Sequence, residues 1–217
     1  QAQFAARIAA QGFPVFRFDR RGIGDSEGTN RGFQQSEADI RAAIAAFRAV
    51  SPATIRIVGY GNCDAATALA LAGGAGCDGL LLGNPWTLET AEDQTPPSVV
   101  RDHYRRRLAD PAAILRLLTG KVSIAALLGS LRQATRPQPP ANPLARAMAD
   151  GLDQFAGDIR FLLAGRDRTA QAFLSTWQAL GRSADPTIRM FEDASHSFVE
   201  ASAREWLVAQ TLDMLRG

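Results

Sequence analysis

Short apolar runs alternate with longer helix-forming segments along most of the chain. The apolar runs are partly β-branched, as is typical of buried strands, and they cover 14–19, 54–60, 77–83, 159–165 and 187–191. Segments with helical character lie before, between and after them, at 1–10, 36–50, 64–71, 169–180 and 201–215. This alternation predicts an α/β fold, in which a mostly parallel sheet is flanked by helices.

Residues 87 to about 156 break the alternation. This stretch is helical in character and richer in Pro and Arg than the rest, and it contains no good strand. Its candidate helices lie near 98–109, 111–119, 122–134 and 143–155. Because 217 residues fit one domain, we expect a single domain over 1–217 with a helical cap insertion at about 87–156.

Composition narrows the class of protein. Hydrophobic residues make up 46% of the chain and charged residues 21%, which is ordinary for a globular protein, and no apolar run is long enough for a membrane span. The start of the chain resembles an amphipathic helix more than a signal peptide, and the two cysteines fit a reducing compartment, so we expect a cytoplasmic location. The net charge of +2 gives no general attraction to nucleic acid. The oligomeric state stays open.

The run at 54–60 turns almost directly into the helix-forming segment at 64–71, with Cys63 on the turn. Small residues at Gly61 and Ala65 allow a strand and a helix to pack closely there, and the backbone N–H of Asp64 at the helix start is a candidate oxyanion donor. A strand–turn–helix with a nucleophile on the turn is a nucleophile elbow. The alternative is that Cys63 is a small buried apolar residue.

Two further candidates follow later strands. Asp167 comes after the run at 159–165, and His196 comes after the run at 187–191. An imidazole can take the proton of a cysteine thiol, and a carboxylate can orient the imidazole, so the three residues are a candidate catalytic triad. Asp167 could instead cap the next helix, Asp193 or Glu192 could take its place beside His196, and His196 could be a solvated loop residue. His103 and His196 are isolated and show no metal-ligand spacing.

Several motifs resemble the α/β-hydrolases. The stretch from Asp19 to Gly28 is similar to the loop after the fourth strand of these enzymes, and the elbow, the Asp after a strand and the late His appear in the order typical of the family. More narrowly, three segments resemble the hydrolase 1 group associated with the bacterial exosortase A system, which is encoded near exopolysaccharide and protein-sorting genes. These segments are 61–64, 84–86 and 103–108. Dienelactone-hydrolase-like enzymes also carry Cys at the elbow.

The chain departs from this family in two ways. Ala65 stands where Gly is usual, which is a small change. The resemblance also implies three earlier strands and a His-Gly oxyanion loop ahead of the helix at 1–10, with one of these strands lying between 14–19 and 54–60. These N-terminal strands are missing from the sequence, so we expect one oxyanion donor, the N–H of Asp64, and low activity from this chain.

Together these features predict a cysteine hydrolase or acyltransferase that acts on an ester or thioester of a small-molecule acyl substrate and needs no cofactor. Trp86 and Phe198 could line the acyl pocket, although burial alone would also explain both aromatics. An alternative is a non-catalytic α/β-hydrolase scaffold in an exopolysaccharide or protein-sorting assembly. A nucleotide-binding protein is a weak third alternative, because Gly22-Ile23-Gly24 lacks the full dinucleotide fingerprint.

Overall fold

A parallel sheet lies at the centre of the molecule. The computed structural model describes residues 1–88, 142–182 and 184–217. Within these residues four strands pair in the order β1-β2-β3-β4, all parallel. Their bounds are Val58–Asn62 (β1), Gly79–Gly83 (β2), Asp158–Ala164 (β3) and Ile188–Phe191 (β4). The predicted fold class is thereby confirmed, and these strands correspond to four of the five apolar runs.

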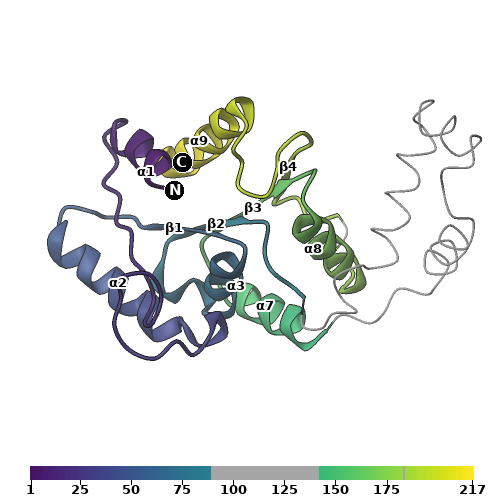
Figure 1. Ribbon diagram of the computed structural model, residues 1–217, viewed down its shortest axis with the longest axis horizontal. Coiled ribbons are helices and arrows are strands. Elements are labelled where there is room, and N and C mark those ends of the chain that lie inside the picture. Colours follow the sequence, from purple (N-terminus) through teal and green to yellow (C-terminus); the bar gives the residue numbers. More distant parts are fainter. Residues whose placement is uncertain (89–141, 183) are drawn as a thin grey trace, which may run out of the picture.

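Helices cover both faces of this sheet (Figure 1). One face carries α1 (Ala2–Ala9) and α9 (Ala201–Arg216). The other carries α2 (Glu37–Val50), α3 (Asp64–Leu71), α7 (Pro143–Asp153) and α8 (Arg168–Ala179), and two short 3₁₀ helices lie at Phe33–Gln35 and Gly73–Gly76. No described helix is long and apolar enough to cross a membrane.

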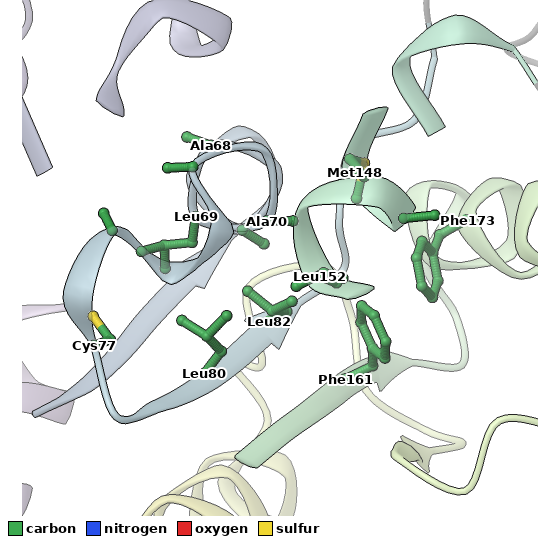
Figure 2. Packing of buried hydrophobic residues seen from close by; sticks show 14 of the residues in the cluster. Ala68, Leu69, Ala70, Cys77, Leu80, Leu82, Met148, Leu152, Phe161 and Phe173 are labelled. Atoms are coloured by element: carbon green, nitrogen blue, oxygen red, sulfur yellow. The ribbon is translucent and has the colours of Figure 1, made fainter. Parts of the chain in front are cut away.

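Successive residues of the central strands enter different halves of the core. Leu80 and Leu82 of β2 pack with Phe161 of β3 under α3 and α7, as Figure 2 shows. Leu81 packs on the opposite face, among residues that include Leu207 of α9. Because neighbouring side chains point to opposite faces of a strand, a run of leucines is buried on both sides, as parallel sheets require.

Helix α7 lies between β2 and β3 in the sequence, and it belongs to the layer that also holds α2, α3 and α8. The side chain of Asn142 caps it by accepting from the backbone N–H of Ala145 at 2.9 Å. Its buried face, which includes Leu144, Met148 and Leu152, packs against the core. This helix confirms the one predicted at 143–155. The candidates at 98–109, 111–119 and 122–134 lie outside the described residues, so the cap at 87–156 stays a prediction.

The prediction of a strand at 14–19 is wrong. These residues form no strand, and Val15, Phe16 and Phe18 remain 39% to 46% exposed. The composition of the run is that of a strand, but a strand also needs a neighbour for its backbone groups. Residues 14–20 lie instead across a cavity of about 670 Å³ from β1.

The lining of this cavity identifies it as a gap beside a sheet edge. It is lined by consecutive residues, 57–62 on one wall and 14–20 on the other, together with side chains of α1 and α2. A strand face would offer only every second residue, whereas an edge offers every residue in turn. Within the described residues β1 pairs with β2 alone, so its other edge borders the cavity. This is the place where the family resemblance implies a further strand.

Candidate active site

The turn between β1 and α3 holds Cys63 in an unusual conformation. Its φ is 60° and its ψ is −122°, a region that residues other than glycine rarely adopt and that costs about 1–3 kcal/mol. The strained peptide is fixed on both sides. The N–H of Cys63 donates to the carbonyl of Gly83 at 2.9 Å, and its own carbonyl accepts from the N–H of Thr67 at 3.2 Å. Such a turn presents the thiol at the carboxyl end of the sheet.

Close packing of strand and helix requires the small residues of the elbow. A Cβ at Gly61 would lie 2.5 Å from the carbonyl carbon of Ala65, so no larger residue fits at position 61. The backbone N–H of Asp64 hydrogen-bonds to the Cys63 sulfur. This places the N–H of the predicted oxyanion donor beside the candidate nucleophile. The side chain of Asp64 turns away to an ion pair with Arg20, with Arg20 Nη2 and Asp64 Oδ2 3.1 Å apart.

The surroundings of Cys63 favour the neutral thiol. Burial raises the pKa of Cys63 above its ordinary value, and the carboxylates of Asp64 and Asp167 raise it further, against the opposing hydrogen bond from the Asp64 N–H. The helix start and a nearby imidazole would by themselves favour the thiolate. Burial and negative charge outweigh them, so Cys63 needs a base to become nucleophilic near neutral pH.

Asp167 has two roles at once in the structure. It is the N-cap of α8 and accepts from the backbone N–H groups of Thr169 and Ala170, both at 3.2 Å. The same carboxylate lies 2.8 Å from the ring of His196, between Oδ2 and Nδ1. The carboxylate of Asp167 therefore caps α8 and also lies beside the His196 ring, because it has enough lone pairs for all three donors. The triad itself stays a prediction. A carboxylate only accepts, so Nδ1 carries the proton and Nε2 is left free to act as a base.

The structure brings the three candidates to one end of the sheet. Asp167 is close enough to influence the pKa of Cys63, and the residue before Cys63, Asn62, hydrogen-bonds to the main chain of His196. Within the described residues no hydrogen bond joins the Cys63 sulfur to the His196 ring. Catalytic hydrogen bonds are often long before substrate binds, so this arrangement remains compatible with a triad.

The two candidate pocket aromatics have different surroundings. Trp86 is partly buried, and its backbone N–H donates to the carbonyl of Cys63 at 3.3 Å, which ties it to the elbow. Phe198 is 1% exposed and stacks on Trp206 of α9, with ring centroids 5.9 Å apart. Packing in the core therefore accounts for Phe198, and Trp86 is the better candidate for the wall of a pocket.

Sequence reasoning missed Arg20 and Asn84. Arg20 lies in a loop that resembled a family motif as a whole, and nothing in its spacing indicated a pairing with Asp64. Asn84 directly follows β2 and is completely buried. A polar residue at the end of a buried parallel strand is the signal that could have identified it. No group of three or more His, Cys, Asp or Glu side chains suited to a metal occurs within the described residues.

The chain is similar to one protein family and to solved structures. The alpha/beta hydrolase family matches residues 1–210 of the chain. MenH from S. aureus is 13% identical over 92% of this chain and 82% of its own, with a TM-score of 0.43. BpoC from Mycobacterium tuberculosis H37Rv, described as a non-heme bromoperoxidase, is 15% identical over 92% of this chain and 80% of its own, with a TM-score of 0.42. No curated protein matches the sequence.

Proposed function

The chain belongs to the alpha/beta hydrolase family, and from this premise we propose that it is a cysteine-dependent hydrolase or acyltransferase. Its substrate would be an ester or thioester of a small acyl group. One observation carries the proposal: Asp167 and His196 form a 2.8 Å pair at the same end of the sheet as the strained Cys63. A nucleophile, a base and a residue that orients the base are what acyl transfer requires.

The chemistry follows from these positions. Nε2 of His196 takes the proton from the Cys63 thiol as the sulfur bonds to the carbonyl carbon of the substrate. The N–H of Asp64 stabilises the oxyanion that forms, and Asp167 stabilises the charged ring. The intermediate then breaks its bond to the leaving alcohol or thiol, which takes the proton from His196. Water or an acceptor alcohol, deprotonated by His196, attacks the resulting thioester, and Cys63 regains its proton.

A raised thiol pKa suits this mechanism. A cysteine that ionises by itself needs no base at its side, whereas the pKa of Cys63 is held up by burial and by two carboxylates. Its reaction therefore depends on proton transfer to His196 in the same step. The dependence on His196 is the property that separates a catalytic cysteine from a merely exposed one.

A second candidate is a non-catalytic scaffold in an exopolysaccharide or protein-sorting assembly, as the resemblance to the exosortase-associated group implies. The observation that favours it is the same raised pKa, because a neutral thiol without a hydrogen bond to the His196 ring is also what an inert cysteine would show. In a scaffold, the reactivity of Cys63 would not depend on His196.

Acylation of Cys63 distinguishes the two candidates. The chain is mixed with p-nitrophenyl acetate near neutral pH, and the acetyl adduct is followed by intact-mass spectrometry and located by peptide mapping. We expect an adduct on Cys63, no adduct at that position in Cys63→Ala, and much slower formation in His196→Ala. Cys77→Ala is the matched control, since burial raises the pKa of Cys77 to about 11. Equal acylation in His196→Ala would favour the scaffold.

A further inference from the structure

Two side-chain amides connect the segments that carry the candidate triad. Asn62 is the last residue of β1 and directly precedes Cys63, and Asn84 directly follows β2. The Nδ2 of Asn84 donates to the carbonyl oxygen of His196 at 2.8 Å and to Oδ1 of Asn62 at 3.1 Å. The Nδ2 of Asn62 donates to the same His196 carbonyl at 3.3 Å. We call Asn62 and Asn84 the amide clamp.

The clamp also reaches the segment that carries the acid. Oδ1 of Asn84 accepts from the backbone N–H of Ala164 at 2.8 Å, at the end of β3 and shortly before Asp167. The backbone N–H of Asn84 donates to the carbonyl of Leu162 at 3.1 Å. One side chain thus contacts the main chain next to the base and next to the acid, and it reaches the nucleophile turn through Asn62.

Burial makes these hydrogen bonds consequential. Asn84 is 0% exposed, so a group that loses its partner there has no water to replace it. The backbone around the clamp is adapted to it. Asn84 has a φ of 40°, a conformation that asparagine tolerates better than most residues. A Cβ at Gly83 would lie 2.7 Å from Oδ1 of Asn62, so glycine leaves room for the amide pair.

His196 is consequently held at two points. Its ring is fixed by Asp167 at Nδ1, and its peptide carbonyl is fixed by the two amides. The ring contact sets how the imidazole is turned, but it cannot fix where the main chain of the loop lies. The carbonyl contact joins that main chain to β1, and therefore to Cys63, which follows Asn62 in the chain. The preceding residues of the loop are held separately, Ser195 by Glu200 and Ala194 by the N–H of Arg166.

We propose that the amide clamp is a positioning site for the base, which holds the main chain of His196 at the distance from Cys63 at which Nε2 can take the thiol proton. The proposal rests on the proposed function. Asn62 and Asn84 do not touch the reacting atoms and act through His196. A shift of about 1 Å in such a group costs on the order of 100-fold in rate.

The variants that test this are Asn84→Gly, which keeps the backbone conformation and removes the amide, and Asn62→Ala, which removes one donor. Asn142→Ala is the matched control. Asn142 also bridges two segments, because its Nδ2 donates to the carbonyl of Thr87 at 2.6 Å while its Oδ1 caps α7. No hydrogen bond joins Asn142 to His196 in the described part of the chain, so its loss reports the general effect of removing a structural amide.

Two reactions of the Cys63 thiol distinguish a loss of His196 positioning from a general disturbance of the fold. Acetylation of Cys63 near neutral pH needs His196 as a base, whereas alkylation by iodoacetamide well above the thiol pKa needs only an accessible sulfur. We expect Asn84→Gly to lower the acetylation rate by roughly 10- to 100-fold, and Asn62→Ala to lower it less, with alkylation changed by less than about twofold. Asn142→Ala should lower neither rate, although its melting temperature falls.

A second measurement is independent of catalysis. The chain contains two histidines, so ring NMR signals can be assigned with a His103→Gln variant. We expect the His196 signals to shift or broaden in both clamp variants and to stay unchanged in Asn142→Ala. If Asn84→Gly fails to fold, Asn62→Ala decides the question. Unchanged ring signals, or equal losses in both reactions, would overturn the clamp. If the ring signals respond but the wild type forms no adduct on Cys63, the proposed function is overturned, while the link between the two amides and the His196 ring remains.

Discussion

The two sides of β1 are held in different ways. On the side of β2 the strand is paired along its whole length, and the pairing continues past its end through the Cys63–Gly83 hydrogen bond and the amide clamp. On the other side it borders a cavity of about 670 Å³. Across the cavity, the ion pair of Arg20 with Asp64 links residues 14–20 to the elbow.

This difference divides the candidate site. The proposed nucleophile turn and the main chain of the proposed base are held by hydrogen bonds to Gly83 and Asn84 at the end of β2, and Asn84 is completely buried. The proposed oxyanion donor is the N–H of Asp64, on the first turn of α3, and Asp64 borders the cavity. There Arg20 has one nitrogen, Nη1, that is buried without a hydrogen-bond partner in the described residues. The proposed nucleophile turn, base and acid are therefore tied together by hydrogen bonds at the ends of β2 and β3, whereas the proposed oxyanion donor lies on the side that borders the cavity.

The largest expected effect lies on the side of β2. We expect His196→Ala and Asp167→Asn each to lower Cys63-dependent acyl transfer, the His variant by on the order of 10⁴-fold, and the double variant to be little worse than the worse single one, since members of a triad act as a unit. Asparagine still caps a helix, so Asp167→Asn should leave α8 intact. Single-turnover acylation rates of the wild type, the two single variants and the double variant measure these effects. If the losses of the two single variants multiply in the double variant, or if Asp193→Asn lowers the rate more than Asp167→Asn does, then Asp167 is the wrong partner of His196.

Stability should show the same contrast between the two sides. Phe161 is 1% exposed in the core between β3 and the helices, whereas Phe18 is 46% exposed beside the cavity. We expect Phe161→Ala to lower the free energy of unfolding by about 3–5 kcal/mol, because it leaves a cavity in packed surroundings. Phe18→Ala should cost less than about 1 kcal/mol. Equilibrium denaturation with urea measures both. A similar cost for the two would mean that 14–20 is packed in solution as firmly as the core.

The smallest expected effect concerns the ion pair that borders the cavity. The Asp64 carboxylate contributes to the raised pKa of Cys63, so Asp64→Asn should lower this pKa and shift the alkylation curve to lower pH. Arg20→Ala leaves the carboxylate without its cation and should shift the curve to higher pH. Below the pKa the thiolate fraction falls tenfold for each unit by which the pKa rises, so we expect opposite changes of about 2- to 10-fold near neutral pH.

Rates of iodoacetamide labelling as a function of pH measure these shifts, with Asp25→Asn as the control for a change of net charge. Shifts of the same sign in both variants would show that Arg20 and Asp64 do not act on Cys63 as a pair. We expect Cys63 to label faster than Cys77, because burial raises the pKa of Cys77 to about 11. Equal rates would contradict the proposed role of Cys63.

Local sequence determined much of this protein. The apolar runs of β2 and β3 could be recognised because strands buried on both faces need apolar residues at successive positions. The elbow was recognisable because a strand that turns directly into a helix leaves little choice but small residues at Gly61 and Ala65. Asp167 and His196 could be proposed because each follows a strand and the carboxyl ends of parallel strands meet at one edge of a sheet.

Tertiary structure decided the rest. The run at 14–19 has strand-forming residues but pairs with no strand among the described residues, and a strand exists only through the backbone groups of its neighbour. Phe198 packs under α9, which its position in a loop did not reveal. The raised pKa of Cys63 depends in part on Asp167, which is distant in sequence, and the amide clamp depends on contacts between β1, β2, β3 and the His196 loop. The spacing of apolar residues indicates which face of one segment is buried. The properties above arise instead from pairs of groups that only the folded chain brings together.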